Sequence, residues 1–435
     1  MSLAYLSAVL KGAFGFVSST VDPVTGQVIF QNSRRIATCD DDNTLAIIGD
    51  SFSAGYLIPS NGLYSEAANC YITHAMALSG RRMRIVGNYS VSGSGVSANL
   101  GGTSMLTQID SAIASGARNL LCMGGINDAI YDQTLQSVKD AWAVIIAKAA
   151  KANMRIWLCT QPTMNSANGS YTIARQAQCM EQNNYLRRIK LPSVRVIDCA
   201  AAVVDPASAT GNYITNGSRD NLHPSNVAAY YMGKPVAAAW NAEAPARPTL
   251  LSSVADAYSY SSASSNILDN GLFLTGTNTA TGFSTAVTNT GAVTPTLVAR
   301  SDGFGRDQVL TGTFAAAGDG FRLTSSDYKA RISDGDVLYV EAEISCSSIT
   351  NLSGLQLQLI LSHTGRDEIA TSCYYNPAED KVLPEGYTAV LRTPEFTYGA
   401  AAFGTVNYLL ASVRAFGAGA GGATVKIGRM AIRKR

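Results

Sequence analysis

TLAIIGDSFSAG, residues 44–55, decides the fold of the first half of this chain. Its first six residues form an apolar run of the length of a strand, which stops at a glycine. Similar runs recur, separated by longer stretches with helical spacing of apolar residues: MRIVGN (83–88), NLLCMGG (119–125), MRIWLCT (154–160) and VRVIDC (194–199). Alternation of buried strands with helices is typical of a parallel sheet covered on both faces. We therefore predict an α/β fold, a three-layer α/β/α sandwich with a five-stranded parallel sheet, over residues 43–243.

The other segments differ from this region in composition and patterning. Residues 1–42 are predicted to be an N-terminal extension with a short helix, a turn and a strand containing QVIF (27–30). Residues 244–265 contain prolines and then a serine-rich stretch, which predicts a linker. Residues 266–435 are rich in Thr, Gly and Ala and show two-residue alternation, as in LQLQL at 355–359. That pattern predicts a C-terminal antiparallel β-sandwich, jelly-roll-like, acting as a carbohydrate-binding or oligomerisation module.

Composition argues against several classes of protein. Charged residues make up 15% of the chain, the formal net charge is +2, and basic residues cluster only at the C-terminus, so we expect no nucleic-acid partner. No apolar run approaches the roughly 20 residues that span a bilayer, and no secretory signal stands out, so we expect no membrane insertion. Eight cysteines without a CxxC pair and three histidines predict no metal and no cofactor. The sequence leaves open whether Cys346 and Cys373 pair.

Polar residues follow three of the predicted strands. Ser51 ends the first block in GDS, NYSVSG (88–93) follows the second strand, and GIND (125–128) follows the third. Because the carboxyl ends of parallel strands meet at one edge of a sheet, we expect these loops to share one rim. DNLHP (220–224) comes far downstream. Each block alone has a structural explanation, as a helix cap or a turn, but the four together in this order favour catalysis.

These four blocks resemble those of the SGNH, or GDSL, hydrolase superfamily of serine esterases, in the family's order. The resemblance covers the predicted α/β region and implies a flavodoxin-like sheet. It implies that Ser51 is the nucleophile and that Asp220 and His223 complete a catalytic triad. It also implies an oxyanion hole formed by the backbone N–H groups of Ser51 and Gly93 and the side-chain amide of Asn127.

The chemistry of these residue types agrees with that resemblance. Serine is a weak nucleophile at neutral pH and needs a base within hydrogen-bond reach. His74 lies in a helical stretch and His363 in the β-rich half, which leaves His223 as the base. A carboxylate three residues earlier can hold Nδ1–H and leave Nε2 to accept the serine proton.

The choice of oxyanion-hole glycine rests on spacing. NYSVSGSG contains both Gly93 and Gly95. The Asn-x-x-x-Ser-Gly spacing fits the family better for Gly93, so we predict that Gly93 is the donor. Fixed donors of this kind are each worth a few kcal/mol of activation barrier.

The family accepts acetylated sugars, lipids, thioesters and aryl esters, so the fold does not fix the substrate. The loops YLIPSNGLYS (56–65) and TMNSANGSYT (163–172) are polar, unlike the apolar lids that receive acyl chains. We therefore predict hydrolysis of O-acyl, chiefly O-acetyl, esters on a polysaccharide, with acetylated polysaccharide as the partner. Two alternatives stay open: a short-chain lipase or thioesterase, and a receptor-binding module with an idle hydrolase domain.

The low charge, the Gly-, Ala- and Thr-rich second half and the lack of a signal peptide also resemble bacteriophage tail spike or tail fibre proteins. The resemblance implies a virion tail protein that is made in the host cytoplasm and deacetylates bacterial surface glycan. It also suggests a homo-oligomer, a trimer, assembled through the C-terminal module. An extracellular or cell-surface bacterial esterase is the alternative.

Overall fold

The computed structural model describes residues 18–21, 28–31, 43–60, 62–97, 100, 103–246, 266–364 and 366–434. In the N-terminal segment, β1 (Ser18–Val21) and β2 (Val28–Gln31) form an antiparallel hairpin, so the predicted QVIF strand is present. The helix predicted in the extension and most of the predicted linker lie outside the described residues. Asn43–Arg435 form a second compact unit, which is described by itself below.

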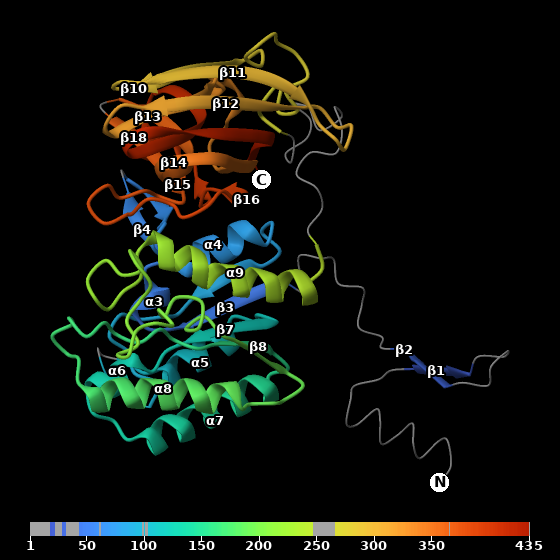
Figure 1. Ribbon diagram of the computed structural model, residues 1–435. Helices are drawn as coiled ribbons and strands as arrows, with labels where there is room; N and C mark the ends of the chain where they lie inside the picture. Colours follow the sequence, from blue (N-terminus) through green and yellow to red (C-terminus); the bar gives the residue numbers. More distant parts are fainter. Residues whose placement is uncertain are drawn as a thin grey trace. The chain divides into compact units, whose positions relative to one another are not determined.

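A five-stranded parallel sheet organises the first half of this second unit (Figure 1). Its strands correspond to the five predicted runs, and all neighbours pair in parallel. In spatial order they are β6 (Arg84–Asn88), β3 (Thr44–Gly49), β7 (Asn119–Met123), β8 (Arg155–Cys159) and β9 (Val194–Ile197). The predicted α/β fold class is confirmed.

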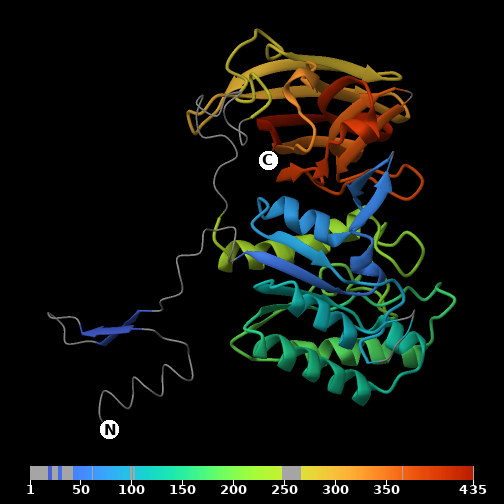
Figure 2. The same cartoon turned by 180° about the vertical axis from the view of Figure 1, so that it is seen from behind.

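Helices cover both faces of this sheet, as Figure 1 shows from one side and Figure 2 from the other. α4 (Tyr71–Leu78) and α9 (Asn226–Glu243) pack on the face that receives Leu45 and Ile47. Ala46 and Ile48 point to the opposite core. That core is formed with α5 (Met105–Ala114), α7 (Leu135–Lys151) and part of α8 (Ile173–Arg187). A strand buried on both sides must be apolar throughout, which explains the unbroken TLAIIG run. Every helix in the described ranges is too short or too polar to cross a bilayer.

The strand order places a switch point at β3. From β3 the chain moves outward to β6 and then returns to β7 on the other side of β3. Connections that leave a parallel sheet in opposite directions open a crevice at the carboxyl ends of the two central strands. The segments that follow β3, β6 and β7 therefore converge at one edge.

The second half of the unit is an antiparallel, nearly closed β-sandwich, which confirms the predicted fold class for this region. Two long strands, β14 (Val337–His363) and β18 (Val406–Lys434), pair with each other along most of their length, with several register shifts. The other edge of β18 carries β12 (Arg306–Phe314) and β13 (Ala317–Ser325). The remaining strands complete the two layers: β10 (Phe283–Thr288), β11 (Ala292–Ala299), β15 (Arg366–Ser372), β16 (Thr388–Arg392) and β17 (Phe396–Thr397).

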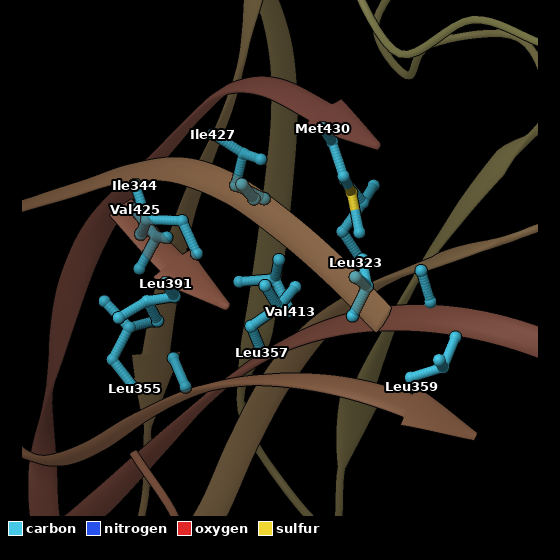
Figure 3. Packing of buried hydrophobic residues seen from close by; sticks show 14 of the residues in the cluster. Leu323, Ile344, Leu355, Leu357, Leu359, Leu391, Val413, Val425, Ile427 and Met430 are labelled. Carbon is cyan, nitrogen blue, oxygen red and sulfur yellow. The ribbon is translucent and has the colours of Figure 1, made fainter. Parts of the chain in front are cut away.

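Leucine, isoleucine and valine side chains fill the centre of the sandwich (Figure 3). Leu355, Leu357 and Leu359 are buried there as their alternation predicts. The glutamines between them are buried too, with Gln356 3% and Gln358 5% exposed. The Gln358 amide donates to Gln356 Oε1 at 3.2 Å, and this bond lets a polar face be covered. The alternation therefore marks two buried faces rather than a core face and a solvent face.

The cysteines of the sandwich are free thiols. Cys346 and Cys373 are both buried, and neither takes part in a disulfide. Burial raises the pKa of the Cys373 thiol to about 12, so this thiol stays protonated at neutral pH. The pairing that the sequence leaves open does not occur in this structure.

A buried ion pair joins the sandwich to the α/β half. The Arg81 guanidinium, just after α4, donates to Glu66 Oε1 at 2.5 Å and to Glu66 Oε2 at 2.7 Å. The two side chains are only 4% and 3% exposed. Arg81 also donates to Ser372 Oγ at 2.9 Å and to the carbonyl oxygens of Val390 and Arg392. The two charges pair within the α/β half, and the further bonds of Arg81 to Ser372, Val390 and Arg392 tie this pair to the sandwich.

Replacing Arg81 by methionine should lower the free energy of unfolding by about 3–5 kcal/mol, because it leaves the Glu66 carboxylate buried without its counter-ion. Urea denaturation followed by fluorescence measures this change. Arg84→Met, at an exposed position of β6, is the matched control and should change stability by less than about 0.5 kcal/mol. Equal effects of the two substitutions would contradict the role of the ion pair.

Candidate active site

Ser51 is the first residue of α3 (Ser51–Ala54), directly beyond the carboxyl end of β3. Asp50 caps this helix, and its Oδ1 accepts the N–H of Phe52 at 3.0 Å. Gly49 must be glycine because an added Cβ would lie 2.5 Å from the carbonyl oxygen of Met123. The sharp strand-to-helix turn places Ser51 in the crevice at the switch point.

His223 reaches Ser51 from a loop far downstream. Its Nε2 lies 2.8 Å from Ser51 Oγ, and its Nδ1 lies 2.6 Å from Asp220 Oδ2. A carboxylate can only accept, so Nδ1 carries the proton and Nε2 is the acceptor that faces the serine. The structure brings these three predicted residues together by direct hydrogen bonds.

Asp220 is held as a carboxylate by its own loop. Burial alone would raise the pKa of Asp220, but hydrogen bonds from the backbone and ring N–H groups of His223 and from the N–H of Leu222 lower it below its ordinary value. An ionised Asp220 keeps the imidazole in the tautomer that leaves Nε2 free to accept a proton.

Several hydrogen bonds to backbone carbonyl oxygens hold the loop that carries His223. The N–H of Arg219 donates to the His223 carbonyl oxygen at 3.1 Å, and Ser218 Oγ donates to the same oxygen at 2.9 Å. Tyr213 Oη donates to the carbonyl oxygen of Leu222 at 2.9 Å. The imidazole is therefore fixed by backbone contacts as well as by Asp220.

The other two histidines are occupied elsewhere. His74 Nε2 lies 2.7 Å from the carbonyl oxygen of Ala68, and burial lowers the pKa of His74 to about 4. His363 lies against Glu368 in the sandwich at 3.3 Å. Among the three histidines of the chain, His223 alone contacts a serine at the rim of the parallel sheet.

Potential hydrogen-bond donors lie in the two segments that follow β6 and β7. Asn127 lies in α6 (Ile126–Ile130), which follows β7, and its amide donates to the Ser94 carbonyl oxygen at 3.0 Å. Gly93, in the loop after β6, has a φ of 81°, which favours glycine. Within the described ranges, the backbone N–H groups of Ser51 and Gly93 take part in none of the hydrogen bonds found. These N–H groups and the second hydrogen of the Asn127 amide can therefore serve an oxyanion.

Gly95, the alternative considered from the sequence, has a different environment. It is buried and forms an isolated bridge with Ser104, and its carbonyl oxygen accepts the N–H of Met105 at the start of α5. Gly95 thus helps to begin a helix, whereas Gly93 is half-buried and sits in the left-handed region.

Sequence reasoning missed Gln161, which ties the nucleophile turn to the Asn127 helix. Its Nε2 donates to Asp50 Oδ2 at 2.6 Å, and its Oε1 accepts the N–H of Ile126 at 2.9 Å. Burial raises the pKa of Asp50 to about 7, although the bonds from Gln161 and Phe52 oppose that rise. Gln161 lies two residues beyond the end of β8. Polar residues after the carboxyl end of this fourth strand are expected at the same rim, and this is the sequence signal for it.

Two more positioning side chains were missed. Gln108 of α5 accepts the N–H of Gly49 at 2.8 Å and donates to the Gly49 carbonyl oxygen at 3.0 Å. Asp128 accepts the N–H of Val96 at 2.6 Å and that of Ser97 at 2.9 Å. Beyond the end of the sheet the backbone has no neighbouring strand with which to pair, and these two side chains bond to it instead. Asp128 is adjacent to Asn127 in the GIND block, which is the only sequence signal for it.

The arrangement places a serine hydroxyl next to an imidazole and that imidazole next to a carboxylate, which is a geometry that can perform acyl transfer. Residues 47–229 match the model of the GDSL-like lipase/acylhydrolase family. The α/β half is therefore similar to that family over this range. The matched range includes Ser51, Gly93, Asn127, Asp220 and His223.

Several solved structures are similar to part of this chain. A GDSL-like lipase from Bacteroides thetaiotaomicron VPI-5482 is 11% identical, covers 46% of this chain and 87% of its own, and gives a TM-score of 0.36. A member of the lipolytic protein G-D-S-L family from Veillonella parvula DSM 2008 is 16% identical, with 44% and 94% covered and a TM-score of 0.31. An acetyl xylan esterase is 12% identical, with 45% and 98% covered and a TM-score of 0.35. The comparison with curated protein sequences gives no match.

Gln161→Leu should destabilise the protein by about 2–4 kcal/mol, because it leaves the Ile126 N–H and the Oδ2 atom of Asp50 without a partner. The loss should be larger at pH 8.5 than at pH 5.5. Because the pKa of Asp50 is raised in the folded protein, the protein loses stability as the pH rises. Removing a donor to the charged carboxylate raises this pKa further, so the loss of stability continues to a higher pH.

Urea denaturation at the two pH values measures this difference. Gln136→Leu, on the exposed surface of α7, is the control and should show no pH-dependent change. An equal loss of stability for Gln161→Leu at both pH values would be evidence that the Asp50 charge does not depend on this bond.

Proposed function

We propose that this protein is a serine esterase in which Ser51 is the nucleophile, His223 the general base and Asp220 the residue that orients it. The observation that carries this proposal is the continuous chain from Ser51 Oγ to His223 Nε2 at 2.8 Å and from His223 Nδ1 to Asp220 Oδ2 at 2.6 Å. Serine needs a base at this distance to become nucleophilic at neutral pH. The similarity of residues 47–229 to an acylhydrolase family supports this chemistry.

In the acylation step, Ser51 Oγ attacks the ester carbonyl carbon while its proton moves to His223 Nε2. The carbonyl oxygen becomes an anion and receives hydrogen bonds from the N–H groups of Ser51 and Gly93 and from the Asn127 amide. When the tetrahedral intermediate collapses, the bond to the alcohol oxygen breaks. The alcohol takes the proton from His223, and the acyl group stays on Ser51.

In the deacylation step, a water molecule attacks the acyl-serine and gives its proton to His223 Nε2. The second tetrahedral intermediate uses the same three donors. Its collapse returns the proton to Ser51 Oγ and releases the carboxylic acid. Asp220 stays ionised throughout and stabilises the imidazolium that forms in each half-reaction.

We further propose that the ester is an O-acetyl group on a polysaccharide. Beside the His223 loop lies the segment 163–172, which carries asparagine and serine side chains. The N–H of Asn165 donates to the Asn221 carbonyl oxygen at 2.9 Å, so this polar segment is fixed next to the catalytic loop. Hydroxyl groups of sugars match such a surface better than a long acyl chain does.

Ser51→Ala should lower kcat for p-nitrophenyl acetate by at least about 10³-fold while the melting temperature changes little, because only the attacking oxygen is lost. A fluorophosphonate should also label Ser51 in the wild type, with loss of fluoride and formation of a Ser51 Oγ–P bond, and mass spectrometry locates the label. Ser111→Ala, exposed on α5, serves as the control and should retain wild-type turnover. Unchanged turnover in Ser51→Ala would exclude this mechanism.

The acyl preference separates the proposed substrate from a lipid. The wild type should release acetate from acetylated bacterial polysaccharides, and kcat/KM for p-nitrophenyl esters should fall as the acyl chain lengthens from two to about eight carbons. A rise with chain length would instead favour a lipase. Binding of glycan without any acetate release would favour a receptor-binding role.

The location in a virion tail and assembly as a trimer stay predictions from composition. They concern where the esterase would act and not its chemistry. A surface glycan as substrate is compatible with that location and equally with a bacterial cell-surface enzyme.

A further inference from the structure

A long loop of the sandwich reaches the catalytic loop of the α/β half. It lies between β15 and β16 and spans residues 373–387. On the sandwich side, the N–H of Leu383 donates to the Leu352 carbonyl oxygen at 2.7 Å, and the Tyr375 ring stacks on Phe416 with centroids 5.4 Å apart. The loop is therefore anchored to the sandwich core before it contacts the other half. Long ordered loops of this kind are commonly functional.

Two residues of this loop bond to both flanks of the Asp220 and His223 pair. Glu379 Oε2 accepts from the Arg219 guanidinium at 2.8 Å, and Arg219 immediately precedes Asp220. The Lys381 N–H donates to Asn226 Oδ1 at 2.8 Å, and the Asn226 amide donates to the Lys381 carbonyl oxygen at 2.8 Å. Asn226 lies three residues beyond His223.

The Asn226 contact is well suited to fix a position. The side chain is 1% exposed, and its amide pairs with one backbone unit through both its donor and its acceptor. It also approaches the Ser353 carbonyl oxygen at 3.3 Å. A two-point bond of this kind allows neither sliding nor rotation, and breaking it leaves buried backbone groups without partners.

Movement at either flank would be passed on to the imidazole. Between the flanks, the Arg219 N–H bonds to the His223 carbonyl oxygen, and the Ser225 N–H bonds to the Gly217 carbonyl oxygen at 2.9 Å. Pro224 restricts the backbone between them. The segment from 219 to 226 therefore moves as one piece, and a shift of about 1 Å at the reacting atoms can cost about 10²-fold in rate.

The nucleophile side has a parallel attachment. The hairpin of β4 (Leu57–Ser60) and β5 (Leu63–Glu66) follows α3. Ser65 Oγ in this hairpin accepts the N–H of Thr371 of β15 at 3.1 Å. The segments next to Ser51 and next to His223 thus both rest on the same region of the sandwich, which sets one relative to the other.

We propose that Glu379 and the Lys381 backbone, through Arg219 and Asn226, are a positioning device of the esterase site, so that the β-sandwich sets the distance from His223 to Ser51. This inference rests on the proposed function for its kinetic consequence. It assigns the sandwich a role in turnover in addition to any role in binding glycan or in assembly. Arg219 and Asn226 are positioning residues, since neither contacts the reacting atoms.

The molecule offers a matched control for this proposal. Glu385, in the same loop, accepts from Lys234 at 2.7 Å and from Tyr230 Oη at 2.9 Å, both on α9. The Glu385–Lys234 and Glu379–Arg219 pairs are similarly exposed and both cross the interface. The Glu385 pair lies beyond the start of α9 and does not flank the Asp220 and His223 pair.

The test compares Asn226→Ala, Glu379→Ala and Glu385→Ala in the full chain. With an activated acetyl ester, Asn226→Ala should lower kcat by about 10–100-fold and Glu379→Ala by about 3–10-fold, with KM within twofold of the wild type. Glu385→Ala should keep the wild-type kcat. Titration of Ser51 with a fluorophosphonate corrects each kcat for the folded fraction, which removes a purely structural loss.

A second readout does not depend on ester turnover. The proton shared by His223 Nδ1 and Asp220 should give a low-field NMR resonance, because the two atoms are only 2.6 Å apart. This resonance should be broadened or lost in Asn226→Ala and retained in Glu385→Ala. If the wild-type protein cleaves no ester, the proposed function is wrong, but the NMR comparison still tests the positioning role. Wild-type kcat and an unchanged resonance in both Asn226→Ala and Glu379→Ala would overturn the positioning role.

Discussion

The change of direction at β3 is the constraint on which the rest of the structure depends. Because β6 and β7 pair on opposite sides of β3, the three segments that leave these strands meet over one crevice. At that edge the backbone loses its ladder partners although it remains largely buried. Side chains take over the vacated hydrogen bonds, as Gln108 does at Gly49 and Asp128 does at Val96. These bonds hold the turn that presents Ser51 and leave the Ser51 N–H outside the hydrogen bonds found among the described residues.

The buried carboxylates of Asp50 and Glu66 also depend on hydrogen-bond donors. Asp50 and Glu66 are almost fully buried, and each has donors on both carboxylate oxygens. A buried network of this kind stabilises one arrangement only while every member is satisfied. Asp50 receives its donors within the α/β half, from Phe52 and Gln161, whereas Ser372 of the sandwich donates to Glu66 Oε2 at 2.8 Å. The bonds of Asp50 therefore hold the site, and those of Glu66 also link the two halves.

The parallel sheet could be predicted because its strands are buried on both faces and read as unbroken apolar runs of strand length. The blocks around Ser51, Asn127 and His223 could be predicted because few residue types perform this chemistry and the chain has only three histidines. Gln161 could not, because glutamine has no motif and its partner Asp50 is 111 residues away. The contact of Asn226 with Lys381, 155 residues apart, left no local signal either. The burial of Gln356 and Gln358 could not be predicted either, because alternation reports polarity and not which face is covered.

The pairing of β14 with β18 has a consequence for how the protein is made. β18 lies between β14 on one edge and β12 and β13 on the other, although it is synthesised after all of them. Until residues 406–434 have left the ribosome, the sandwich exposes unpaired strand edges, and such non-local pairing is slow. The bonds from Arg81 to Ser372 Oγ and to the Val390 carbonyl oxygen can form only after these sandwich residues have been synthesised. The surroundings of this buried charge in the α/β half are therefore completed by residues that lie almost 300 positions later in the chain.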